Sequence, residues 1–145
     1  VSKAHALPRR QVYQAALELS SKEVDPVMAE KRKSNGHIGA ACRIAQDYER
    51  RGFAVARRRW RGQSGEIDLI VQDGEGLIFI EVKQSRSFDR AAQALSQAQM
   101  RRVYRTAEEF LGTQPLGSLT DVRFDVALVI GFGDTQIIEN AFDHF

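Results

Sequence analysis

Three charged residues stand in two short segments whose residues alternate between apolar and polar. Asp68 lies in the segment GEIDLI, and Glu81 and Lys83 lie in the segment FIEVK. Between these segments the chain reads Asp-Gly-Glu-Gly at positions 73–76, a composition typical of a tight β-hairpin turn. If these four residues form the turn, antiparallel register places Asp68 directly opposite Glu81. We therefore expect two carboxylates to be neighbours across one hairpin.

Two opposed carboxylates repel each other and raise each other's pKa, so this pair needs a neutralising partner. A divalent cation such as Mg²⁺ suits this role, because it prefers oxygen ligands and commonly takes one or two carboxylates beside water and phosphate oxygens. Strand alternation places Lys83 on the same face as Glu81, while Ile78, Ile80 and Val82 point to the other face. Lys83 would then orient or deprotonate an attacking water, or offset the charge of a phosphorane-like transition state.

The same residues fit a simpler interpretation, in which they are solvated charges on the outer face of a half-buried hairpin. Lys83 would then pair with Glu66 or Glu81. The two interpretations differ in the cross-strand pair that they require. Oppositely charged residues stabilise a hairpin when they face each other, but the predicted register places two acids opposite each other. The register therefore favours the cation-binding interpretation.

Several blocks of the sequence, in this order, resemble the core of PD-(D/E)xK nucleases. More narrowly, the chain is similar to the bacterial YraN-type family, which is related to archaeal Holliday junction resolvases and is largely uncharacterised. The resemblance runs from about Gly39 to Phe145 and includes the blocks GAACRIAQDYERRGF, GEIDLI, FIEVK, AEEFL, RFDVALVI and IENAF. It implies that Asp68 and Glu81 hold Mg²⁺ or Mn²⁺ and that Lys83 is the catalytic lysine. The implied activity is a resolvase-like DNA endonuclease that hydrolyses phosphodiester bonds with a metal-activated water.

Three positions depart from the pattern of that family. Relatives usually carry a helical glutamate that completes the metal site, where this chain has Ala41. An arginine two residues after the motif lysine is replaced by Ser85, and a lysine on the following helix by Gln99. These losses leave a second interpretation open, a nuclease-fold module that binds nucleic acid with weakened or lost catalysis.

The net charge of +2 conceals a strong segregation of charge along the chain. Residues 1–61 carry 14 Lys and Arg against six Asp and Glu, whereas residues 62–145 carry seven against 13. Arginine clusters attract nucleic-acid phosphates without reading sequence. We therefore expect nucleic acid, in the first place DNA, to contact a cluster that consists of Arg50, Arg51, Arg57, Arg58, Arg59 and Arg61.

The alternative for this arginine cluster is a charged edge strand that deters aggregation. Trp60 lies inside the cluster and either stacks on an unpaired base or packs against the core. Asp125, in the RFDVALVI block, either supports the candidate site or forms an ion pair with Arg123.

The predicted elements give an α/β domain with a restriction-endonuclease-like core, in which helices flank a mixed central sheet of about five strands. Ser87 or Asp89 is expected to cap a long helix that ends before Gly112. Along with that helix we expect a helix near 38–52, a strand at 53–60, the hairpin, a strand at 122–130 and a short strand near 136–139.

We divide the chain into a helical N-terminal extension, residues 1–36, and a nuclease-like domain, residues 37–145. Helices are expected at 8–19 and 26–33 within the extension. In the following helix Cys42 recurs at helical spacing with Ile38, Ala41, Ala45 and Tyr48, which predicts a packed apolar residue rather than a reactive thiol.

The sequence contains no apolar run that approaches the ~20 residues needed to span a bilayer, and its N-terminus lacks the apolar core of a signal peptide. We therefore expect a cytoplasmic protein with no membrane partner. Resolvases cut two strands symmetrically, so the resemblance also predicts a homodimer.

Overall fold

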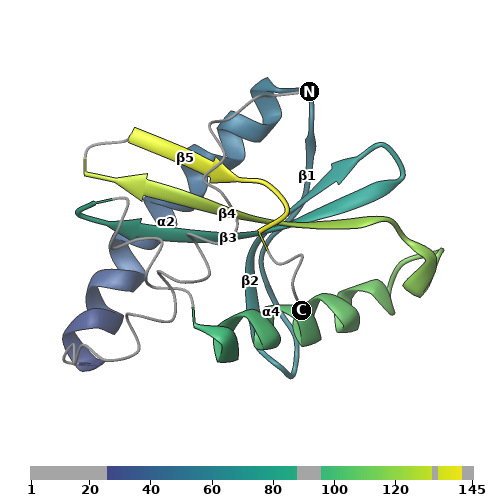
Figure 1. The fold of residues 1–145 in the computed structure, drawn as a ribbon, viewed down its shortest axis with the longest axis horizontal. Helices are drawn as coiled ribbons and strands as arrows, with labels where there is room; N and C mark the ends of the chain where they lie inside the picture. The colour runs from purple at the N-terminus through teal and green to yellow at the C-terminus, as the bar shows by residue number, and fades with distance from the viewer. Residues whose placement is uncertain (1–25, 88–95, 132–133, 142–145) are drawn as a thin grey trace.

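The computed structural model of this chain describes residues 26–87, 96–131 and 134–141, with side chains from residue 38 onward. Its elements, in chain order, are α2 (Pro26–Arg50), β1 (Ala54–Arg61), β2 (Glu66–Asp73), β3 (Gly76–Ser85), α4 (Gln97–Leu111), the 3₁₀ helix η2 (Gly117–Leu119), β4 (Val122–Ile130) and β5 (Asp134–Ile138). The strands form one sheet in the order β1-β2-β3-β4-β5 (Figure 1). β3 and β4 are parallel and the other pairs are antiparallel. The predicted α/β class with a five-stranded mixed sheet is confirmed, and it is consistent with a restriction-endonuclease-like core.

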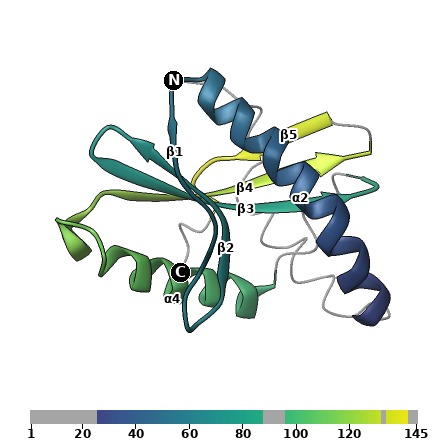
Figure 2. The same ribbon diagram turned by 180° about the vertical axis from the view of Figure 1, so that it is seen from behind.

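Helices cover the two faces of the sheet (Figures 1 and 2). Figure 2 shows α2 in front of the strands, where Ile44 packs with Ile80. On the other face Phe110 of α4 packs with Phe79. Because successive residues of β3 point to opposite faces, its even-numbered residues face α2 and its odd-numbered residues face α4. This alternation decides which helix the polar residues at the end of β3 meet.

The hairpin of β2 and β3 has the register that its turn residues predict. Its pairs begin at Asp73 with Gly76, and in the part of the chain that the structure describes they end at Leu69 with Ile80. Beyond that pair β2 continues only along β1, and β3 continues only along β4. In Figure 1 the first half of β2 accordingly turns down towards α4 while β3 runs on beside β4. We call this point of separation the fork.

The helix before the sheet differs from the prediction in two ways. Residues 26–33 and the following helix form one continuous element, α2, which crosses the boundary expected at residue 36. The extension itself stays a prediction, because residues 1–25 lie outside the described residues. Cys42 is exposed rather than packed, and Ile38 is 44% exposed. The buried stripe is centred on Ile44 and Tyr48, and at about 100° per residue this turns Cys42 away from the sheet.

The helix on the other face begins at Gln97, with Ser96 as its N-cap. The Ser96 hydroxyl accepts a hydrogen bond from the Gln99 N–H at 3.1 Å. The expected caps, Ser87 and Asp89, precede or fall within residues 88–95, which the structure does not describe. Gly112 follows the last turn as predicted. Neither of the two α-helices in the described ranges has the length and apolar character that crossing a bilayer would require.

Candidate active site

The three charged residues singled out from the sequence lie together at the fork and are buried. Asp68, Glu81 and Lys83 are only 7%, 6% and 7% exposed. Glu81 and Lys83 share the odd-numbered face of β3 with Phe79, so they point to the side of the sheet that α4 covers. The surface-charge interpretation of the hairpin is therefore wrong for these residues.

Asp68 takes the place of a strand partner where the ladder ends. Its Oδ2 accepts a hydrogen bond from the Val82 N–H at 2.8 Å. In a continued ladder Val82 would face Ile67. The expected direct pairing of Asp68 with Glu81 does not form, because β2 leaves β3 one step earlier. The carboxylate is instead tied to the backbone of the residue that stands between Glu81 and Lys83.

Both strands of the neighbouring β1–β2 hairpin change face at the level of Asp68. In β1, Arg58 reaches Glu49 of α2, whereas the Trp60 ring packs on α4. In β2, the residue paired with Arg58 belongs to the core under α2, and the residue paired with Trp60 belongs to the core under α4. Residues two apart in a regular strand share a face, so alternation is interrupted between these pairs. The interruption coincides with Arg59, whose φ is +49°.

Lys83 and Gln99 both contact the carboxylate of Glu81. Lys83 Nζ lies 3.4 Å from Glu81 Oε1, and Gln99 Nε2 donates a hydrogen bond to the same oxygen at 3.5 Å. Of the two partners expected for Lys83, Glu81 is therefore the one observed. Gln99 lies in the first turn of α4, three residues after the Ser96 cap. From the sequence it was only a departure from a family pattern, and its contact depends on a helix start that the sequence did not predict.

The donor set at the fork suits a hard divalent cation. Two carboxylates, from Asp68 and Glu81, are what Mg²⁺ usually takes from a protein when water and phosphate oxygens fill its other positions. Within the described ranges, no three His, Cys, Asp or Glu side chains are grouped in a way that could hold a metal ion. Ala41 is partly buried in the apolar core under α2 and supplies no ligand. Among the described residues, the carboxylates at the fork are those of Asp68 and Glu81.

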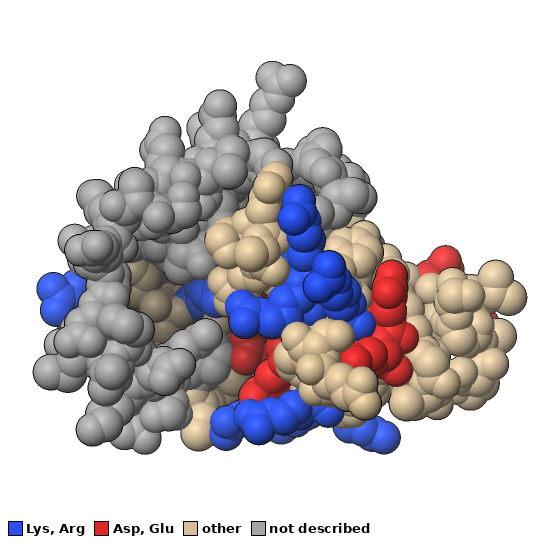
Figure 3. Space-filling view, turned by 90° about the horizontal axis from the view of Figure 1, so that it is seen from below, with Lys and Arg blue, Asp and Glu red and all other residues tan. Residues whose placement is uncertain are grey.

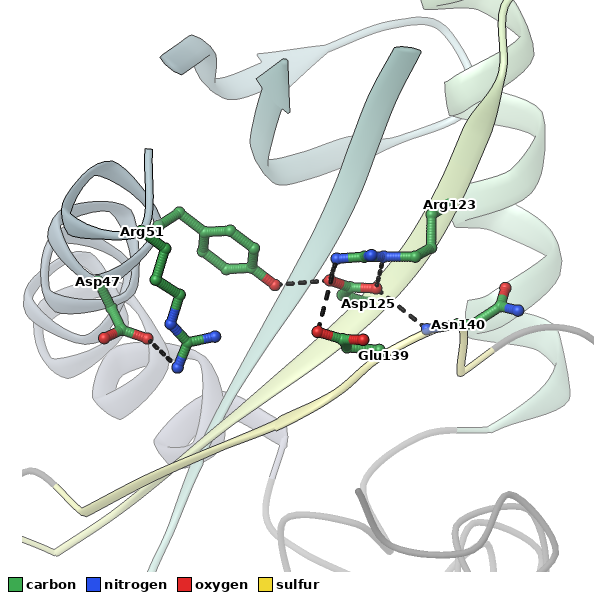
Figure 4. A network of polar contacts seen from close by, with 7 residues as sticks. Asp47, Arg51, Arg123, Asp125, Glu139 and Asn140 are labelled. Atoms are coloured by element: carbon green, nitrogen blue, oxygen red, sulfur yellow. Dashed lines mark hydrogen bonds and ion pairs between the residues drawn. The ribbon is translucent and has the colours of Figure 1, made fainter. Parts of the chain in front are cut away.

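A third buried carboxylate, Asp125, belongs to a different network (Figure 4). It is fully buried, and its oxygens accept hydrogen bonds from the Tyr48 hydroxyl at 2.7 Å, from Arg123 at 2.9 and 3.0 Å, and from the Asn140 N–H at 3.0 Å. Arg123 also lies 3.9 Å from Glu139. The expected ion pair of Asp125 with Arg123 is confirmed. The network joins α2 to β4 and to the turn after β5.

Burial and the charge of Asp125 govern the titration of this network. Desolvation, and then the adjacent Asp125 carboxylate, raise the pKa of Tyr48 far above its usual value. Burial alone would lower the pKa of Arg123, but its hydrogen bonds with Asp125 and the charges of Asp125 and Glu139 raise it above the ordinary arginine value. Tyr48 therefore stays a neutral donor and Arg123 a cation.

The predicted arginine cluster lies at the end of α2 and along β1, and most of its members contact acids. Arg58 lies 3.4 Å from Glu49, and Glu66 receives both Arg59 and Arg61. Other contacts of the cluster join Arg50 to Asp47 at 3.7 Å, Arg51 to Asp47 at 2.9 Å, and Arg57 to the Ala56 carbonyl at 2.7 Å. Figure 3 shows that basic and acidic side chains also lie side by side on the face of the molecule seen from below.

Of the two roles expected for Trp60, the structure shows packing against the core rather than an exposed ring that could stack on an unpaired base. Its ring lies edge-on to Phe110 of α4 with centroids 5.2 Å apart. The loop before β2 also rests on α4, because Glu109 accepts hydrogen bonds from the Ser64 N–H at 3.3 Å and the Ser64 hydroxyl at 3.2 Å. These contacts fix the diverging hairpin to the helix that covers the site.

Comparisons with known proteins identify the family. The model of the uncharacterised protein family UPF0102 matches residues 42–129. A UPF0102 protein of Ruegeria pomeroyi is 56% identical over 101 residues, which are 70% of this chain and 82% of the relative. A UPF0102 protein of Cereibacter sphaeroides is 59% identical over 99 residues, 68% and 85% of the two chains. One from Ruegeria sp. strain TM1040 is 49% identical over 119 residues, 80% and 96%. The chain belongs to the uncharacterised protein family UPF0102.

Proposed function

We propose that this protein is a divalent-metal-dependent endonuclease that hydrolyses phosphodiester bonds in DNA. The observation that carries the proposal is the joint burial of Asp68, Glu81 and Lys83 at the fork. Charged side chains are rarely buried, and burying them costs desolvation energy that their mutual contacts often do not recover. A buried group of two acids and a lysine at an interruption of the sheet is therefore a candidate for chemistry rather than for stability.

The charge of the group supports a cation and a phosphate as its partners. With both carboxylates ionised and Lys83 protonated, the three side chains carry a net charge of −1. That charge repels a phosphodiester. A divalent cation held by Asp68 and Glu81 would reverse the sign to +1 and make the same place attractive to phosphate oxygens. When bound, Mg²⁺ or Mn²⁺ would polarise the scissile phosphate and lower the pKa of an attacking water.

The chain's own residues would divide the remaining work. Asp68 is held by the Val82 N–H, which keeps one carboxylate oxygen fixed while the strands diverge. Lys83 Nζ lies 3.4 Å from Glu81 Oε1, and in its protonated form this amine can donate hydrogen bonds to a water or to a phosphate oxygen. Gln99 donates to the same Glu81 oxygen and so limits the rotation of that carboxylate. Lys83 would thus stabilise charge that develops on the phosphate during attack.

The test is cleavage of labelled junction, flap, single-stranded and linear duplex DNA in the presence of Mn²⁺. Lys83→Ala removes the ammonium, and Asp68→Asn removes a charge while keeping an oxygen that can accept from Val82. Glu75→Gln, at the exposed hairpin turn, is the matched control. We expect the wild-type protein and Glu75→Gln to cut, with activity reduced at least about a hundredfold in the other two variants. Cutting that survives both site variants would refute the proposal.

A second candidate is a nucleic-acid-binding module that keeps the fold and lacks efficient catalysis. It is favoured by Ala41 and by the two-carboxylate character of the site. Calorimetry separates the two candidates, because an enzyme should bind Mn²⁺ in a way that Glu81→Gln weakens. Salt-sensitive DNA binding with no Mn²⁺ site and no cleavage would establish the binding module.

Within the first candidate, junction resolution makes a further demand. Symmetric cutting of two strands needs two active sites, so the protein should form a homodimer on its substrate. Sedimentation equilibrium with and without a four-way junction measures this directly. A monomer under both conditions would restrict the activity to one-strand substrates such as flaps.

A further inference from the structure

The most unusual backbone in the sheet belongs to an arginine. Arg59 lies inside β1 with φ of +49°, a left-handed conformation that residues with a Cβ rarely adopt. It stands between the pairs Arg58–Leu69 and Trp60–Ile67, at the level where both strands change face. Glycine would fit this conformation with less strain. A strained residue that is not glycine points to a use for its side chain.

That side chain shares a carboxylate with a second arginine. Arg59 Nε lies 3.2 Å from Glu66 Oε1, and Arg61 Nη2 lies 3.1 Å from Glu66 Oε2. The two oxygens of one anion are thus divided between two guanidinium groups. A phosphodiester presents its two non-bridging oxygens in a similar way, and guanidinium groups bind both kinds of anion through paired N–H donors.

The contacts with Glu66 are of a kind that exchanges easily. The side chains of Arg59 and Arg61 are 52% and 76% exposed, and that of Glu66 is 27% exposed. Ion pairs this exposed contribute little net stability, so an incoming anion can displace the carboxylate. A polyanion also releases counterions when it binds, which a single carboxylate does not.

The position suits a substrate of the candidate site. Arg59 comes level with Asp68 on the adjacent strand, and neighbouring strands lie about 4.8 Å apart. We propose that Arg59 and Arg61 bind a backbone phosphate of the nucleic acid, and that Glu66 holds this place in the unbound protein. The inference rests on the proposed function for its choice of nucleic acid, but its test needs no cleavage.

Binding of a short labelled DNA duplex is measured by fluorescence anisotropy in EDTA, across a salt titration. Glu66→Gln removes the carboxylate that pairs with Arg59 and Arg61. Glu75→Gln makes the same charge change at the distant hairpin turn. We expect Glu66→Gln to tighten binding about fivefold, the upper range for releasing an exposed ion pair, and Glu75→Gln to change it less than about twofold.

The arginines are then removed in both backgrounds with Arg59→Gly and Arg61→Gln. Glycine accepts the left-handed backbone and position 61 is exposed, so the fold should persist, which thermal unfolding checks. Because the two arginines are proposed to neutralise one phosphate together, we expect the slope of log affinity against log salt to fall by about one, and the gain from Glu66→Gln to disappear. Should the double replacement fail to fold, each single replacement must still reduce that gain.

Equal effects of Glu66→Gln and Glu75→Gln would overturn the inference, as would a gain that survives loss of both arginines. Neither result bears on cleavage in Mn²⁺. Conversely, a protein that cuts no DNA but shows the predicted dependence on Glu66 would lose the proposed activity and keep this phosphate site. The two proposals can therefore fail separately.

Discussion

Two buried carboxylates on the central part of the sheet have very different surroundings. Asp125 is completely buried and receives hydrogen bonds of 2.7–3.0 Å from side chains of α2 and β4 and from the backbone after β5. Glu81 is 6% exposed and meets Lys83 and Gln99 at 3.4 and 3.5 Å. The hydrogen bonds of Asp125 are thus shorter than both of these contacts of Glu81.

The difference teaches what each carboxylate is for. Short hydrogen bonds fix Asp125 and connect α2 to β4 and to the turn after β5, which is the arrangement expected of a structural tether. Longer contacts, such as those of Glu81 with Lys83 and Gln99, are exchanged more easily than the short hydrogen bonds of Asp125. A metal ligand or a catalytic group must change partners, whereas a tether must not. The same type of side chain therefore serves the fold in one place and, by our proposal, chemistry in the other.

The comparison is tested most severely by removing Asp125. Asp125→Ala leaves the partly buried Arg123 without its nearer charge partner and removes the acceptor for the buried Tyr48 hydroxyl. We expect a loss of about 3–5 kcal/mol in the free energy of unfolding, measured in urea. Glu81→Gln, a neutral isostere at the fork, should cost less than this, because the glutamine oxygen can still accept hydrogen bonds from Lys83 and Gln99. Equal losses at the two positions would show that the fork is a tether as well.

Tyr48 allows the tether to be tested by pH. Tyr48→Phe removes one donor to a charged acceptor, so we expect a loss of about 1.5–3 kcal/mol near neutral pH. The folded pKa of Tyr48 is raised above the unfolded value of 10.0, so the stability it contributes is present below pH 10 and declines as pH rises further. The excess stability of the wild-type protein should fall by up to about 1.4 kcal/mol per pH unit above pH 10.

Urea unfolding of the wild-type protein and Tyr48→Phe measures this difference. The pH is varied from about 8 to about 11, which brackets the pKa of an unfolded tyrosine. A gap between the two proteins that stays constant through that range would mean that Tyr48 ionises normally in the folded state.

Much of the hairpin and its chemistry could be predicted from the sequence because the decisive signals are local. The turn at 73–76 fixes the register, and alternation then fixes the faces of Glu81 and Lys83. The same local rules describe β4, an apolar segment that proved buried between neighbours on both sides. The sequence singled out Asp68, Glu81 and Lys83 as a group, but their burial and the contact of Asp68 with the Val82 N–H appear only in the structure.

The parts that were missed depend on distant contacts or on unusual backbone. The Tyr48–Asp125 hydrogen bond joins residues 77 positions apart, and no local pattern indicates it. The end of the ladder at Leu69 follows from how β1 and β2 bend together, and the left-handed Arg59 has no sequence signature of the kind that a glycine gives. Cys42 was misplaced because several phases of an Ala-rich helix look equally apolar.

Two substitutions at Asp68 separate its charge from its hydrogen bond to the Val82 N–H. Asp68→Ala leaves the buried Val82 N–H without its acceptor and should cost about 1–3 kcal/mol, whereas Asp68→Asn keeps an acceptor and should cost less than about 1 kcal/mol. Both variants should lose Mn²⁺ binding in calorimetry. If the asparagine variant bound Mn²⁺ like the wild-type protein, Asp68 would serve only to accept the hydrogen bond from Val82 and would not be a metal ligand.

The smallest effect on stability is expected at Arg59, and it is informative because two terms oppose each other. Glycine relieves the left-handed strain, worth about 1–2 kcal/mol, but it makes the unfolded chain more flexible by about 0.4–1 kcal/mol and loses an exposed ion pair worth at most about 1 kcal/mol. We therefore expect Arg59→Gly to change unfolding by less than about 1 kcal/mol and Arg59→Ala to destabilise by more, since alanine keeps the strain and loses the pair. If both replacements destabilised the protein equally, glycine would relieve no strain, and the left-handed conformation at residue 59 would not be strained in the wild-type protein. The strain argument for a function of this side chain would then fail, whatever its affinity for DNA.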